Sequence, residues 1–160
     1  MKKLVQYAFI IAAILVGAAA RADDDPGSPR AGEQEAADPF LVEARAAIAG
    51  KNWPRASSVL REALAKDAGN VDYHNLYAYT LRMGASPALD VVFKHYNEAL
   101  RINPKHRGAH EYIGEAYLMI GNPGKAKEHL KALDSLCFFG CEEFGKLKKA
   151  IADYEAKQKK

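Results

Sequence analysis

Apolar residues between Pro39 and Lys160 recur mainly at intervals of three and four, the period of an amphipathic helix. No alternating apolar and polar run typical of a strand interrupts this pattern. Glycine or proline punctuates the segment at Gly50, Pro54, Gly69, Gly84, Pro87, Pro104, Gly121, Pro123 and Gly140. Since these residues end or start helices, the pieces between them predict an all-α fold of helices of roughly 11 to 16 residues.

The predicted helices form three copies of one pattern, at about 39–70, 71–105 and 106–136. The third copy is the clearest and contains Ile113-Gly114, Tyr117, Gly121 and Ala126. The second contains Leu76, Gly84, Tyr96, Ala99-Leu100 and Asn103-Pro104, and the first contains Phe40, Ala44, Gly50, Trp53, Ala56, Leu60 and Ala63-Leu64. These spacings resemble those of the tetratricopeptide repeat, in which each copy is a pair of packed helices.

The resemblance implies an α-solenoid of three helix pairs, in which the first helix of each pair lines a concave groove that holds a peptide or helix of a partner protein. The positions that match this groove are Arg45, His74, Asn75, Arg82, Glu111, Glu115 and Met119. Arg82 would lie on the helix next to the one that carries Glu111 and Glu115. This arrangement predicts either a salt bridge between repeats or a floor of mixed charge for a ligand.

The second copy is longer than the others. Gly50 and Gly84 are 34 residues apart, whereas Gly84 and Gly121 are 37 apart, and the extra three residues fall in the stretch ASPALDVV. Pro87 fits the first turn of the following helix, with Ser86 as its N-cap. The extra residues form either a tolerated insertion or a bump that shapes one end of the groove.

Residues 137–160 predict a capping helix after the last repeat. Phe144, Leu147, Ile151 and Tyr154 fall on one helical face, and most lysines fall off it. An open stack of helix pairs needs such a helix to cover its last apolar edge. The chain therefore predicts a solenoid that ends in a C-terminal cap.

Cys137 and Cys141 are the two cysteines of the chain, and they flank the turn before the predicted capping helix. Cys-x-x-x-Cys without a following histidine does not match a haem attachment or a thioredoxin motif, and no histidine neighbours the pair to complete a zinc site. A structural disulfide is the preferred interpretation. A copper site, a redox-active pair and free thiols remain alternatives.

The N-terminus has the pattern of a secretory signal. Lys2 and Lys3 precede the apolar stretch Leu4–Ala20, and Ala20-Arg21-Ala22 has small residues where a signal peptidase cleaves. We expect residues 1–22 to be removed after Ala22 without leaving a membrane anchor, and the protein to act in the periplasm or outside the cell. Residues 23–38 lack large apolar side chains and predict a disordered leader.

The charge balance of the chain and its lack of catalytic motifs narrow the range of expected functions. Without Lys2, Lys3 and Arg21, the chain has 20 basic and 20 acidic residues, so no net positive field favours nucleic acid. No nucleophile elbow, phosphate loop or zinc-protease motif is present, and we expect neither an enzyme nor a bound cofactor or metal. The preferred function is an exported protein–protein interaction module. The alternatives are a periplasmic copper-handling or redox-linked protein that uses the cysteines, and a structural subunit of an envelope complex.

Overall fold

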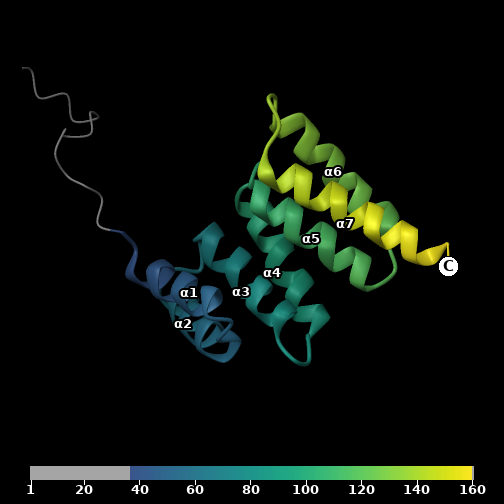
Figure 1. Cartoon of the computed structure of the whole chain (residues 1–160). Helices are drawn as coiled ribbons and strands as arrows, with labels where there is room; N and C mark the ends of the chain where they lie inside the picture. The colour runs from purple at the N-terminus through teal and green to yellow at the C-terminus, as the bar shows by residue number, and fades with distance from the viewer. Residues whose placement is uncertain (1–36, 160) are drawn as a thin grey trace, which may run out of the picture. The chain divides into compact units, whose positions relative to one another are not determined.

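The computed structural model describes residues 37–159, which form seven α-helices and no strand. The helices are α1 (Pro39–Ala49), α2 (Trp53–Lys66), α3 (Val71–Met83), α4 (Leu89–Ile102), α5 (Arg107–Met119), α6 (Pro123–Leu136) and α7 (Glu142–Gln158). They follow one another in chain order from the blue α1–α2 pair to the yellow α7 (Figure 1). The all-α prediction is confirmed.

Most helices begin at a side chain that accepts a hydrogen bond from a free backbone N–H of the first turn. These N-caps are Asp38, Asn52, Asn70, His106 and Asn122. Such caps satisfy donors that have no partner within the helix, and each contributes about 1 kcal/mol. Polar residues that precede the apolar periodic runs therefore explain where five of the seven helices start.

Helices that are neighbours in sequence pack against each other along the whole described chain. In addition, α1 contacts α3, α3 contacts α5, and α5 contacts α7. No such contact joins α2, α4 and α6 within residues 37–159. We call α1, α3, α5 and α7 the inner row and α2, α4 and α6 the outer row; this two-row stack is that of an α-solenoid.

The core consists of three successive clusters of buried side chains. Each cluster draws on both helices of one pair and on the next helix of the inner row. Central members are Ala44, Leu60 and Tyr73 in the first cluster, Ala78, Tyr96 and Ile113 in the second, and Leu118, Leu133 and Leu147 in the third. Because each pair is covered only by its neighbours, the stack is stabilised repeat by repeat.

The last cluster is closed by α7, as the sequence predicts. Leu147 and Ile151 are buried against α5 and α6, and Phe144 and Tyr154 pack beside them. Gly114 of α5 allows this close approach, since a Cβ atom built on it would lie 2.6 Å from Leu147 Cδ2. A side chain at Gly114 would collide with the cap.

Two details of the second repeat differ from the sequence interpretation. Counted from the N-caps Asn70 and His106, Ile113 corresponds to Tyr77 and not to Leu76. The helix after the insertion begins at Leu89, with Ala88 as an N-cap that makes no side-chain hydrogen bond, so Ser86 does not cap it. The buried residues of α4 hold that helix in register against α3, and the extra residues stay in the turn.

The predicted signal peptide (1–22) and nearly all of the predicted leader (23–38) lie outside the described residues. Of the helices between residues 37 and 159, none has the length and apolar composition that a bilayer span requires.

Candidate functional site

All seven residues assigned to the groove from the sequence lie on the inner row. Arg45 is on α1; His74, Asn75 and Arg82 are on α3; Glu111, Glu115 and Met119 are on α5. His74, Asn75, Arg82 and Glu111 are buried, Glu115 is partly exposed, and Arg45 and Met119 are exposed. The inner row thus presents few of these side chains directly to solvent, and the buried ones lie against neighbouring helices.

Polar links join the inner helices at their N-terminal ends. Tyr73 of α3 donates a hydrogen bond of 2.5 Å to Asp38, the N-cap of α1. Asp72 accepts a hydrogen bond of 3.1 Å from His106 Nε2, and this bond is the main reason why the pKa of Asp72 lies below its ordinary value. Arg45 lies 3.9 Å from the other oxygen of Asp72. Side chains at helix starts therefore tie each inner helix to the next.

Arg82 forms the central charged contact between α3 and α5. Its guanidinium is 7% exposed, donates to Glu115 Oε2 at 2.6 Å and to the Tyr96 hydroxyl at 3.3 Å, and lies against the rings of Tyr79 and Tyr112. Burial opposes its charge, but the contacts with Tyr96 and Glu115 outweigh burial and raise the pKa of Arg82 above its ordinary value. Of the two alternatives that the sequence left open, the salt bridge between repeats is present.

Glu111 and Asn75 are two polar side chains of the inner row that are poorly satisfied. Glu111 is 3% exposed and its nearest cation, Lys146 of α7, lies 4.0 Å away. Burial raises the pKa of Glu111 to about 7, only partly offset by Lys146. Asn75 is 4% exposed, and its side-chain oxygen has no hydrogen-bond partner. Buried polar groups left in this state cost stability.

We expect Glu111→Gln to stabilise the protein at pH 8 by about 1–2 kcal/mol and to have little effect near pH 4.5. The folded protein holds a proton on Glu111 up to pH about 7, whereas the unfolded chain releases it near the ordinary value. The stabilising contribution of protonated Glu111 is thus fully present below the pKa of the unfolded chain, and it is lost as pH rises through the pKa of the folded protein. Urea unfolding at the two pH values measures the difference between variant and wild type.

Glu62→Gln on the exposed face of α2 is the matched control, because Glu62 pairs only with Lys66 at the surface. This control should show the same small difference from wild type at both pH values. An equal effect of Glu111→Gln at both pH values would contradict the conclusion that burial of the ionised Glu111 carboxylate costs stability.

Two histidine pairs, which the sequence interpretation missed, connect the inner and outer helices of the second and third repeats. His74 Nδ1 lies 2.8 Å from His95 Nδ1, and His110 Nδ1 lies 2.9 Å from His129 Nδ1. In both pairs Nε2 of the inner histidine faces a backbone carbonyl, that of Ala68 or of Pro104, at 3.0 Å. The same arrangement therefore occurs twice.

The carbonyl contacts define the tautomers. A carbonyl oxygen only accepts, so Nε2 of the inner ring carries the proton, its Nδ1 accepts, and Nδ1 of the outer ring donates. Burial, with a smaller contribution from His110, lowers the pKa of His129 to about 4, and burial likewise lowers the pKa of His95. A histidine four residues after the N-cap in both repeats is the sequence signal that could have revealed these pairs.

His106 and His110, four residues apart, do not face a common point. His106 accepts from the N–H of Ala109 and donates to Asp72, while both ring nitrogens of His110 are engaged with Pro104 and His129. The part of the chain from 37 to 159 contains no cluster of three or more side chains suited to hold a metal ion.

Cys137 and Cys141 form a disulfide bond, as the preferred sequence interpretation expected. Their Cα atoms are 5.5 Å apart, within the range of ordinary disulfides. Gly140 adopts a φ of +82°, the left-handed conformation that glycine tolerates best, and its N–H donates to the carbonyl of Cys137 at 2.9 Å. The bond closes the turn between α6 and α7.

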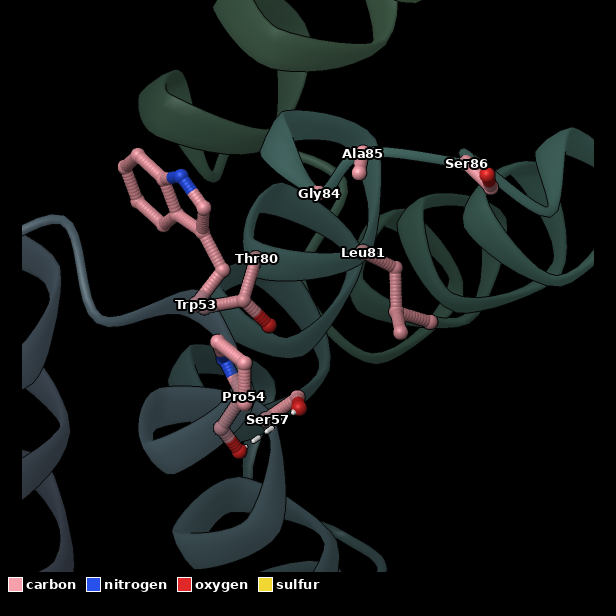
Figure 2. A pocket seen from close by; sticks show the side chains of 8 residues that line it. All are labelled: Trp53, Pro54, Ser57, Thr80, Leu81, Gly84, Ala85 and Ser86. Atoms are coloured by element: carbon pink, nitrogen blue, oxygen red, sulfur yellow. Dashed lines mark hydrogen bonds between the residues drawn. The ribbon is translucent and has the colours of Figure 1, made fainter.

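The surface of the described residues includes two hollows. One of about 350 Å³ lies between the C-terminal half of α7 and the end of α5, lined by Leu118, Met119, Ala150, Asp153, Tyr154 and Lys157. The other, of about 310 Å³, lies between the start of α2, the end of α3 and the inserted turn (Figure 2). Its lining consists of Trp53, Pro54, Ser57, Thr80, Leu81, Gly84, Ala85 and Ser86. We call them the inner hollow and the turn hollow.

Comparison of the sequence with protein-family models and with curated proteins finds no match to either.

Proposed function

We propose that the protein is an exported interaction module of the tetratricopeptide-repeat type, whose inner row binds a segment of a partner protein. The single observation that carries this proposal is the inner hollow. It places an apolar floor of Leu118, Met119 and Ala150 beside charged groups of Asp153 and Lys157. A hollow of this composition suits one apolar anchor side chain of a peptide, with the charged rim orienting its backbone and neighbours.

The neighbouring contacts of the inner row support the same proposal. Partly exposed Glu115, bonded to Arg82, precedes the exposed Met119 by one helical turn on α5. Farther along the row, Glu111 and Asn75 retain unfavourable burial that a more stable sequence would avoid. Natural proteins retain such costs to stability chiefly where function requires them.

Export is supported by the signal-like N-terminus, and a disulfide is compatible with an oxidising compartment. The sulfur atoms of Cys137 and Cys141 are bonded to each other, so neither is a free thiolate ligand in this form. We therefore prefer the interaction module to copper handling.

Site-specific photo-crosslinking in intact cells tests the proposal. A benzophenone amino acid at Met119 or Met83, both exposed at the ends of inner helices, is expected to capture one protein partner. The same group at Ser58 of α2 or Lys131 of α6, exposed on the outer row, is the matched control and is expected to capture little. Mass spectrometry of the adducts identifies the partner.

Equal crosslinking of the same protein from both rows would contradict a binding face on the inner row. Absence of adducts from all four positions in cells that produce the protein at its natural level would contradict the interaction module itself.

A further inference from the structure

Glu111 of α5 lies beneath the first turns of α7, where its carboxylate is removed from water. The residue is 3% exposed, and α5 packs directly against α7. Between residues 37 and 159 the carboxylate has one ion pair, with Lys146 of α7, and at 4.0 Å this contact is too long for a hydrogen bond. A buried carboxylate held in this way is costly to ionise.

Lys146 serves two carboxylates and lies closer to the other one. Its Nζ atom is 2.7 Å from Glu142 Oε1, one turn earlier on α7, and the hydrogen bond to Glu142 is the main reason why the pKa of Lys146 lies above its ordinary value. Glu115, Glu142 and Glu143 add negative charge near Glu111. The shared lysine therefore compensates only part of the cost of a charge on Glu111.

The other titratable groups that the surrounding helices bring to α5 already have partners. These pairs are Arg82 of α3 with Glu115 and with Tyr96 of α4, Arg107 of α5 with Glu143 of α7, and His129 of α6 with His110. Tyr112, next to Glu111 in the chain, has a raised pKa, first through burial and then through Glu111 itself. Relief for an ionised Glu111 must therefore come from water.

Movement of α7 is the simplest way to bring water to Glu111. Within the described chain α7 is the last helix and contacts only α5 and α6, whereas α3 and α5 have inner-row neighbours on both sides. Terminal elements of a repeat stack open more readily than the whole domain unfolds. We propose that α7 is a pH-responsive cap, closed over protonated Glu111 and loosened when the Glu111 carboxylate ionises.

The direction of the response follows from the two states of Glu111. Under the closed cap, burial raises the pKa of Glu111 to about 7, and in the open form water restores the ordinary value of 4.5. The contribution of the protonated carboxyl to cap closure is fully present below about pH 4.5 and is lost as pH rises through about 7. The histidine pairs act in the opposite direction, because burial lowers the pKa of His129 to about 4 and acid therefore weakens its buried contact.

Opening of the cap also removes one wall of the inner hollow. Ala150, Asp153, Tyr154 and Lys157, four of the residues that line it, belong to α7. A partner segment in the inner hollow is therefore expected to bind more tightly below neutral pH than above it. This consequence rests on the proposed function, whereas the opening of α7 does not and can be measured on the purified protein alone.

Hydrogen exchange of the disulfide-bonded protein at pH 5, 6, 7 and 8, read by mass spectrometry, tests the proposal. Rates are corrected for the intrinsic pH dependence of amide exchange, and α2 is the internal reference because it contacts only α1 and α3. Relative to α2, the opening of α7 is expected to increase about 50-fold from pH 5 to pH 8, since each pH unit between the two pKa values changes the equilibrium about tenfold.

Three variants separate Glu111 from other effects of pH. Glu111→Gln keeps the size of the side chain but cannot ionise, and the increase is expected to fall below about threefold. Glu142→Gln leaves Lys146 to Glu111 alone and is expected to reduce the increase. Glu62→Gln, which removes an exposed carboxylate paired with Lys66 on α2, is the matched control and should keep the wild-type increase.

The proposal is overturned if α7 of the wild type opens equally at pH 5 and pH 8, or if Glu111→Gln keeps the wild-type increase. It is also overturned if α2 and α7 loosen together as pH rises, because the effect would then belong to the whole domain. An unchanged or larger increase in Glu142→Gln would contradict the role of the shared lysine and the proposal with it.

Discussion

Gly114→Ala is expected to lower the free energy of unfolding by about 1–2 kcal/mol, although alanine is the better helix former. In an open helix the exchange would gain about 1 kcal/mol. Here the added Cβ atom would lie 2.6 and 2.8 Å from the two Cδ atoms of Leu147, which is fully buried between α5, α6 and α7. Overpacking of this kind costs about 1–3 kcal/mol or more, and it exceeds the helical gain. Urea unfolding measures the change.

Gly145→Ala provides the matched control, because Gly145 lies within α7, is exposed, and has no atom within 4 Å of its added Cβ. This exchange is expected to stabilise the protein by about 0.5–1 kcal/mol. In the double variant Gly114→Ala with Leu147→Ala, the loss should be smaller than the sum of the single losses, since the colliding atoms are gone. Stabilisation by Gly114→Ala would show that α7 does not pack this closely.

Loss of either partner of the Arg82–Glu115 pair is expected to have the largest effect among the polar contacts. Arg82→Met is expected to cost about 3 kcal/mol and Glu115→Gln about 2 kcal/mol. Glu115→Gln keeps a side-chain oxygen that can accept a hydrogen bond from Arg82, whereas Arg82→Met removes both hydrogen bonds of the guanidinium. Arg82→Met also leaves the buried Tyr96 hydroxyl without its partner. Thermal or urea unfolding checks both values.

A double-mutant cycle separates the pair from the other effects of each exchange. Arg82→Met with Glu115→Gln should cost about 1–2 kcal/mol less than the sum of the single variants, because the two charges are removed together. Glu128→Gln, which removes an exposed pair with Lys125 on α6, should leave stability nearly unchanged. Additive losses at Arg82 and Glu115 would mean that the two side chains do not form a coupled pair.

The helices could be read from the sequence because their signals are local. Asn52, Asn70 and Asn122 precede apolar runs of period 3.6 and cap the helices that follow. The spacing of Leu147 and Ile151 likewise identifies the buried face of α7, although the sequence does not show which helices cover it. A disulfide between the two cysteines, which flank a glycine-containing turn, was the preferred interpretation of the sequence, and the structure contains it.

The candidate site was less predictable, because its residues act across helices. Arg82 and Glu115 could be assigned to neighbouring helices from the repeat spacing, and they pair as one of the two alternatives expected. The predicted start of α4 was wrong, because the helix begins where it packs on α3 and not at the Ser86-Pro87 signal. The turn hollow was not recognised, because its walls come from the first repeat and from the inserted turn of the second.

The sequence by itself thus determined the all-α class, the division into helix pairs and the capping helix, and it favoured a disulfide between the two cysteines. Each of these depends on residues within one helix or one turn, whose periodicity and capping chemistry are local. Only the tertiary structure decided that His74 and His110 each bond a histidine 19 to 21 residues away, and that Glu111 and Asn75 are buried with few partners. Burial and hydrogen bonding between helices depend on the register in which sequence-distant side chains meet, and α3, α5 and α7 set that register only when they pack together.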